Sequence, residues 1–216
     1  MKTAILKLND TGLSNCANEA ARILKAGGTV AFPTDTVYGL GAIYSDAEAV
    51  KKIFMAKERP QTKPLSILVS DISQVRMLAA DISDEAYKLM QAFWPGALTI
   101  ILRKNEHADI PDEVSAGGDT IGVRMPDSKA ALKLIEAAGS PLAAPSANIS
   151  GERSARIASE VIDDLDGRID MILDGGDCPI GISSTIADMS GGSCRILRVG
   201  SISEQEIQKV LSDLSV

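Results

Sequence analysis

Cationic and hydroxyl side chains gather in a few short stretches of this sequence, and they suggest what chemistry it can do. One stretch is KERPQTKPLSILV, which begins with Lys57 and Arg59. The others are AFPTDTVYGLG (31–41), TIGVRMP (120–126), APSANISGERSAR (144–156), ISSTIADM (182–189) and RILRVG (195–200). Each lies at the end of an apolar run, where ligands collect in open α/β sheets. Because arginine and hydroxyl groups bind phosphate and carboxylate, the stretches together predict a pocket for a polyanion.

Each stretch also has an ordinary structural explanation. Lys57 and Arg59 follow a helix-like segment, where cations stabilise the negative end of the helix dipole. Ser146 and Asn148 can cap a turn, and Arg198 can pair with an acidic residue elsewhere. The residues leave both explanations open for any single stretch, and only their combination favours the anion pocket.

Several familiar kinds of active site are not supported. The chain has no GxxxxGK[ST] motif, and GLGAIY fails GxGxxG because Tyr44 replaces the last glycine. The single histidine, His107, lies in a polar stretch and has no recognisable serine or cysteine nucleophile to activate. Cys16, Cys178 and Cys194 are far apart and show no CxxC pairing, so neither a disulfide framework nor a zinc site is indicated.

Composition narrows the possible partners. The chain has 216 residues, 45% of them hydrophobic, which is enough for one domain with a sizeable core. Its formal net charge of −7 opposes a general attraction to nucleic acid, and 3% aromatic residues leave few platforms for stacking bases. The N-terminal MKTAILKLND lacks a signal-peptide core, and no apolar run is long enough to cross a membrane. We expect a cytoplasmic protein without membrane segments; the sequence gives no oligomeric state.

Alternating helices and strands must position these stretches. The apolar periodicity predicts helices over 15–26, 45–57, 83–93, 128–139, 156–165 and 203–214. It predicts strands over 29–33, 65–69, 97–102, 120–126, 141–148, 170–174, 184–189 and 194–199. Ser128 is the expected N-cap of one helix, and serine–glutamate pairs at 45/48 and 203/206 have capping-box spacing. With no linker or repeat, we expect a single α/β (α+β mixed) domain over 1–216, with a twisted mixed sheet flanked by helices. Its motif-bearing core would span about 15–200.

Seven segments in order resemble the YrdC-like family of threonylcarbamoyl-AMP synthases. They are GGTVAFPTDTVYGLG, KERPQTKPLSILV, WPGALTIIL, TIGVRMP, APSANISG, STIAD and ILRVG, and they span about residues 27 to 200. The family hallmark is KxR followed much later by SxN. It is matched here by Lys57 and Arg59, and by Ser146 and Asn148.

The resemblance implies a nucleotidyltransferase with a large, positively lined cavity. Such an enzyme combines ATP, L-threonine and bicarbonate into threonylcarbamoyl-AMP and releases pyrophosphate. Mg²⁺ would arrive with ATP, because no carboxylate cluster forms a dedicated metal site. The product would serve threonylcarbamoyl-adenosine modification of tRNA, which makes tRNA or a threonylcarbamoyl-transferase complex the expected partner. Longer members carry an extra C-terminal domain, for which this sequence is too short.

Site residues follow from the family motifs position by position. The resemblance assigns catalysis to Lys57, Arg59, Ser146 and Asn148. It assigns ATP binding to Arg59, Lys63, Thr120, Ser146, Ser154 and Arg198. It assigns threonine binding to Thr36, Leu68, Arg124, Ala144 and Ser184.

The sequence departs from the family pattern at four of its motif positions. Many members have asparagine at the position of Lys63, histidine at that of Leu68, an acidic residue at that of Ser183 and proline at that of Val199. These departures loosen the list of expected contacts. Two alternatives accompany the main hypothesis: a paralogue with another carbamoyl-adenylate acceptor, and an RNA-binding module of the same fold.

Overall fold

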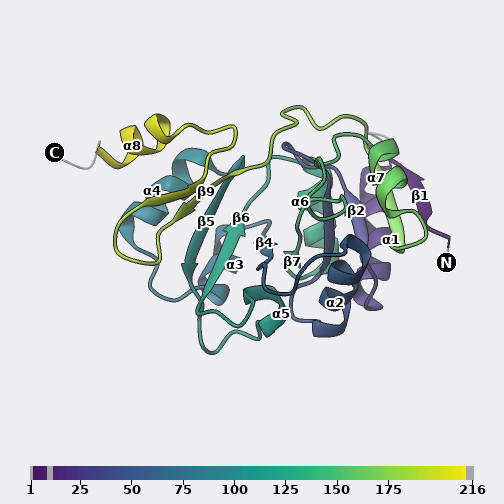
Figure 1. Cartoon of the computed structure of the whole chain (residues 1–216), viewed down its shortest axis with the longest axis horizontal. Coiled ribbons are helices and arrows are strands. Elements are labelled where there is room, and N and C mark those ends of the chain that lie inside the picture. The colour runs from purple at the N-terminus through teal and green to yellow at the C-terminus, as the bar shows by residue number, and fades with distance from the viewer. Residues whose placement is uncertain (1, 9–11, 213–216) are drawn as a thin grey trace.

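The computed structural model describes residues 2–8 and 12–212, and Figure 1 shows their arrangement. The helices are α1 Leu13–Lys25, α2 Ala47–Lys57, α3 Ile72–Leu78, α4 Asp84–Phe93, α5 Asp112–Ser115, α6 Lys129–Ala138, α7 Ala158–Leu165 and α8 Glu204–Ser212. The strands are β1 Ala4–Lys7, β2 Val30–Phe32, β3 Gly39–Ile43, β4 Ser66–Leu68, β5 Leu98–Arg103, β6 Thr120–Arg124, β7 Leu142–Ala143, β8 Met171–Asp174, β9 Thr185–Asp188 and β10 Arg195–Arg198.

Local capping sets several helix boundaries as the sequence predicts. Ser128 accepts a hydrogen bond from the backbone N–H of Ala131 at 3.3 Å and starts α6, which ends at Gly139 in the left-handed region. The capping box of Ser203 and Glu206 is present before α8. Residues 213 and 214 of that predicted helix lie outside the described residues.

The predicted capping box before α2 is wrong. The N-cap is Asp46, whose carboxylate accepts a hydrogen bond from the N–H of Ala49 at 3.0 Å. Glu48 instead pairs with Lys51 at 2.7 Å. Asp46 has the extended backbone that an N-cap requires, and it follows a turn that holds Ser45 outside the helix.

The ten strands form one mixed sheet in the order β1-β8-β2-β3-β7-β4-β6-β5-β9-β10. The pairs β1–β8, β2–β8, β4–β6 and β5–β9 are parallel, and the other five are antiparallel. The mixed α/β fold class is therefore confirmed. Strand β7 has only two residues, so the strand predicted over 141–148 is mostly loop.

Strand β3 escapes prediction because it is rich in glycine. A Cβ on Gly41 would lie 2.8 Å from the ring of Phe32 on the neighbouring strand, so the aromatic ring takes the place of a side chain. Strand β1 and helices α3 and α5 are short elements that the periodicity also misses.

Helices cover the sheet unequally, and this creates room for a site. Around β2 and β8, α1 and α6 pack together over one face and α2 and α7 lie beyond the other (Figure 1). Around β5 and β6, alternate side chains such as Leu98, Ile100 and Val123 join the main core, which α4 also reaches. Thr99 and Arg124 belong to the opposite set and line a pocket.

Candidate active site

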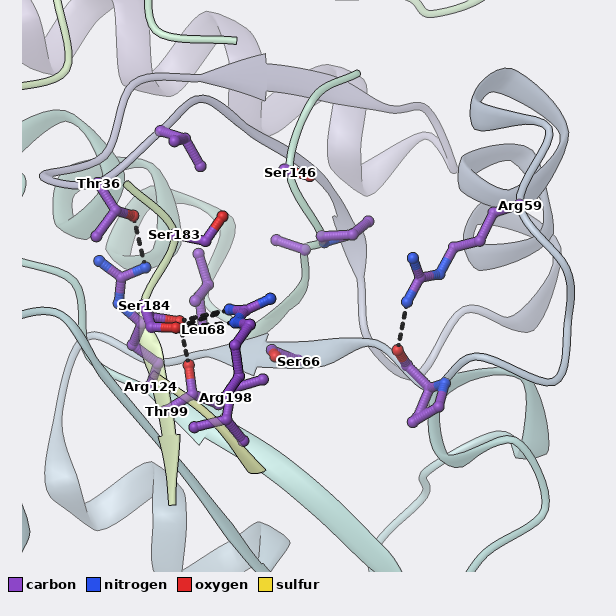
Figure 2. Close-up of a pocket in the computed structure, with 15 residues that line it drawn as sticks. Thr36, Arg59, Ser66, Leu68, Thr99, Arg124, Ser146, Ser183, Ser184 and Arg198 are labelled. Carbon is purple, nitrogen blue, oxygen red and sulfur yellow. Dashed lines mark hydrogen bonds between the residues drawn. The ribbon is translucent and has the colours of Figure 1, made fainter. Parts of the chain in front are cut away.

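A pocket of about 180 Å³ lies on the open face of β4, β5, β6 and β9 (Figure 2). It is lined by Thr36, Val37, Arg59, Pro64, Ser66, Leu68, Thr99, Arg124, Ala144, Pro145, Ser146, Ser183, Ser184, Ile186 and Arg198. This lining has three arginines, several hydroxyl groups and no carboxylate. A local positive site therefore exists in a chain whose formal net charge is −7.

Strand register brings together residues that are far apart in the sequence. Leu68 of β4 pairs with Arg124 of β6, and Thr99 of β5 pairs with Ile186 of β9. Side chains that pair across neighbouring strands share one face of the sheet. Gly122 of β6 lies on the same face, and a Cβ there would come within 3.4 Å of both Thr99 and Ser66. The absence of a side chain at Gly122 therefore leaves space above the sheet at this point.

Arg124 is held at the end of β6 by three partners. Its Nε donates to the carbonyl oxygen of Gly96 at 2.9 Å, and its Nη1 donates to Thr36 Oγ1 at 2.8 Å. Its Nη2 forms a buried ion pair with Asp35. Burial lowers the pKa of Arg124 and raises that of Asp35, although their mutual attraction opposes both shifts. The guanidinium keeps its proton at neutral pH.

The turn that carries Thr36 is fixed before any ligand arrives. Thr34 Oγ1 accepts hydrogen bonds from the N–H groups of Thr36 and Val37 at 3.1 and 3.2 Å. The same hydroxyl donates to the carbonyl oxygen of Val37 at 2.6 Å. Such local bonds order the loop without secondary structure, so the Thr36 hydroxyl holds its place beside Arg124.

Arg198 and two hydroxyl groups form a second cluster next to Arg124. Arg198 donates from Nε and Nη2 to the carbonyl oxygen of Ser184, at 3.1 and 2.8 Å. The hydroxyl groups of Thr99 and Ser184 are 2.8 Å apart. Figure 2 shows Arg124 and Arg198 on one side of the pocket and Arg59 on the other. A ligand with two anionic groups can therefore be held at both ends.

Arg59 also holds the loop at its own edge of the pocket. Its Nη2 donates to the carbonyl oxygen of Pro64 at 2.9 Å, and its Nε lies 3.3 Å from that of Lys63. These bonds leave further guanidinium N–H groups for an anion. Burial lowers the pKa of Arg59, which nevertheless remains a cation.

Lys57 lies beneath the pocket wall rather than among its lining residues. Its side chain is 1% exposed and donates to the carbonyl oxygens of Ser146 and Asn148, at 2.6 and 2.5 Å. The Asn148 amide donates to Ile149 and Glu152, and the Ser146 hydroxyl donates to Asn148 Oδ1. Burial, followed by repulsion from Arg59, lowers the pKa of Lys57 to about 7. The contacts tie the end of α2 to the loop that places Ser146.

The structure brings eight of the predicted site residues into the pocket. They are Thr36, Arg59, Leu68, Arg124, Ala144, Ser146, Ser184 and Arg198. The other five, which do not line it, are Lys57, Lys63, Thr120, Asn148 and Ser154. The ligand roles of all thirteen stay predictions.

Three of these five residues lie near the pocket or at another part of the surface. The Lys63 side chain is exposed, and Ser154 lines a separate hollow beside α7. Thr120 starts β6, four residues before Arg124, but it shares the pocket face of the strand.

Sequence reasoning missed two hydroxyl groups and a carboxylate. Ser66 and Thr99 line the pocket, yet both stand inside runs that read as wholly buried strands. Asp35 was visible beside Thr36, but nothing in the sequence shows that it pairs with Arg124, 89 residues away. The single hydroxyl residue within each of LSILV and ALTIIL is the one sequence signal that one face of these strands is different.

The remaining features of the described residues add no further site. Cys16, Cys178 and Cys194 are free, and His107 is exposed. Within residues 2–8 and 12–212, no group of three metal-ligating side chains is arranged to hold an ion. No helix in the same ranges is both long and apolar enough to span a membrane.

The chain is similar in sequence to a known protein family and to curated relatives. Residues 22–200 match the Sua5_yciO_yrdC family, whose description is "Telomere recombination". The threonylcarbamoyl-AMP synthase of Pyrococcus abyssi is 46% identical over 197 residues, covering 91% of this chain and 57% of that protein. The Bacillus subtilis protein of the same name is 46% identical over 198 residues, covering 92% and 57%.

A solved structure shows the same fold with an amino acid bound. The crystal structure of P. abyssi Sua5 complexed with L-threonine matches with a TM-score of 0.92 at 43% identity. The match covers 98% of this chain and 61% of that one. The chain thus spans about three fifths of the length of these relatives.

Proposed function

The chain belongs to the Sua5/YciO/YrdC family, and from this membership we propose that it forms threonylcarbamoyl-AMP and pyrophosphate from L-threonine, bicarbonate and ATP. The main support for this proposal is the composition of the pocket lining. Three arginines meet hydroxyl groups there without a carboxylate, although acidic residues outnumber basic ones in the chain. Such a site suits a reaction that brings two anions together.

The proposed reaction has two steps that balance without a protein nucleophile. The threonine amine attacks the carbon of bicarbonate, and water leaves to give N-carboxy-threonine. A carbamate oxygen then attacks the α-phosphorus of ATP, the bond from this phosphorus to its bridging oxygen breaks, and pyrophosphate leaves. Both steps need reactants held close together and positive charge fixed in advance.

The two sides of the pocket would divide this work. Thr36, Arg124 and Ser184 would hold threonine, because a guanidinium and two hydroxyl groups match a carboxylate and an alcohol. Arg59 and Arg198 would hold the phosphates of ATP. The enclosed volume is smaller than that of most small-molecule sites, so part of the nucleotide would lie at the mouth.

Mg²⁺ would enter on the phosphates of ATP rather than in a protein-built site. The lining residues offer hydroxyl groups and guanidinium groups, whereas Mg²⁺ prefers carboxylate oxygens and water. None of the proposed steps therefore needs a metal ligand from this chain. We further propose nucleotidyltransferase chemistry in the cytoplasm, with delivery of the product to the machinery that modifies tRNA.

Pyrophosphate release tests the proposal. Purified protein incubated with ATP should release pyrophosphate only when both L-threonine and bicarbonate are present. Release that does not depend on threonine would exclude this function and favour a paralogue with another acceptor. RNA affinity that falls steeply with salt, without nucleotide turnover, would favour the RNA-binding alternative.

A further inference from the structure

Asp35 carries a buried negative charge directly behind the pocket. Its side chain is 6% exposed and that of its partner Arg124 is 7% exposed. The pocket lining includes Arg124 but not Asp35, so the carboxylate touches the site only through the guanidinium. Two buried charges are costly to remove from water unless their arrangement is needed.

The fold leaves a defined part of Arg124 free. A guanidinium has five N–H groups. Gly96 takes the one on Nε, Thr36 takes one on Nη1, and Asp35 takes one on Nη2. One N–H therefore remains on each terminal nitrogen, and each can donate to an oxygen of a carboxylate.

Arg124 also has a second cation, Arg198, beside it in the pocket. Burial is the main cause that lowers the pKa of Arg124, and repulsion between its guanidinium and that of Arg198 adds to the shift. Arg198 is itself held by Ser184. Without a negative charge behind it, Arg124 would be held only by its bonds to Gly96 and Thr36, and an anion deeper in the pocket would compete with them for its guanidinium.

We propose that Asp35 is a positioning residue that aims Arg124 at the carboxylate of the amino-acid substrate and keeps it away from the nucleotide phosphates. This role rests on the proposed function of the same pocket. Asp35 would thereby separate the binding of the two substrates, because Arg124 is kept for the amino acid while Arg59 and Arg198 remain for ATP.

The test is the substitution Asp35→Asn, with L-threonine and ATP titrated separately by calorimetry. The Kd for L-threonine should rise at least tenfold, whereas the Kd for ATP should stay unchanged or fall. A merely structural role would weaken both ligands by the same factor together with a lower Tm. That result, or unchanged binding of threonine, would overturn the positioning role.

A second pair of variants shows whether Asp35 acts through Arg124. In an Arg124→Gln background, adding Asp35→Asn removes the remaining lone charge and should not weaken L-threonine further. An additional loss of affinity would contradict action through Arg124. This comparison also serves if Asp35→Asn alone fails to fold, because the double variant leaves no unpaired buried charge.

A matched control and the parent protein complete the experiment. Asp188→Asn breaks another aspartate–arginine pair, to Arg195 at 2.9 Å, outside the pocket, and should leave both affinities unchanged. If the unmodified protein bound ATP but no L-threonine, the proposed function would fail. Equal threonine binding by the parent and Asp35→Asn would overturn only the positioning role.

Discussion

Lys57 and Arg59 are two residues apart, yet they face different surroundings. Arg59 lines the pocket, while Lys57 is enclosed beneath the loop that carries Ser146. The hallmark pair therefore divides into one side chain that can touch a ligand and one that holds the wall in place. The sequence predicts that both belong to the site, but not this division, because it depends on which way each side chain leaves the end of α2.

Replacing Arg59 tests the pocket at its phosphate side. Arg59→Ala should lower the rate of pyrophosphate release at least about 100-fold, because removal of one preorganised donor commonly costs that much. Arg195→Ala, which changes an exposed arginine outside the pocket, is the control and should stay close to the parent rate. Near-parental turnover in Arg59→Ala, with an intact fold by circular dichroism, would leave Arg59 only its bonds to the neighbouring loop.

Lys57 should make stability depend on pH. Its pKa is about 7 in the folded chain, against an ordinary value of 10.5, so the unfolded chain binds more protons between these limits. The free energy of unfolding should therefore rise with pH from about 7 to 10.5, by up to about 1.4 kcal/mol per unit from this residue. Urea unfolding of Lys57→Met should lack this contribution. Parallel pH curves for the two proteins would contradict it.

At the scale of elements, the start of β9 is fixed by Gly200, two residues beyond the end of β10. A Cβ on Gly200 would lie 2.1 Å from the carbonyl oxygen of Ser183 and 2.6 Å from the backbone of Ser184. Thr185 adds two bonds, accepting from the Gly200 N–H at 2.8 Å and donating to Ile202 at 2.6 Å. The end of ILRVG thus places the serines of the pocket.

Gly200→Ala should disturb the site through the backbone. The added methyl group cannot be accommodated unless the Ser183–Thr185 segment moves, which should cost about 1–3 kcal/mol in the free energy of unfolding. We expect threonine affinity to fall at least tenfold in calorimetry. Gly191→Ala is the matched control, because a Cβ there meets nothing within 4 Å. Equal behaviour of the two variants would show that the contact at Gly200 does not position the serines.

An element can be predicted from the sequence when the residues that set its limits lie close to it in the chain. Helix α6 is bounded by Ser128 and Gly139, both of which act within a few residues, and its limits are predicted closely. Strand β3 and the strand order depend on partners distant in the sequence. The same distinction applies to the pocket lining. Eight of the thirteen predicted residues line it, whereas Ser66 and Thr99 could be placed there only from the strand register.

The distribution of charge matters at the scale of the whole molecule. Acidic residues outnumber basic ones 29 to 22, yet Arg59, Arg124 and Arg198 meet in one pocket. A long nucleic-acid backbone would meet the net negative field, whereas a small anion meets only the pocket. The chain is therefore better suited to a nucleotide and an amino acid than to RNA. The sequence predicts the charge balance, but only the fold brings the arginines together.

Mass spectrometry of the nucleotide product can show whether one pocket joins threonine, bicarbonate and ATP as proposed. Protein incubated with ATP, L-threonine and carbon-13 bicarbonate should yield an AMP adduct that contains both threonine and the labelled carbon. Unlabelled bicarbonate is the control and should give the same adduct one mass unit lighter. An AMP adduct without the label, or nucleotide products that are the same with and without threonine, would exclude the proposed reaction.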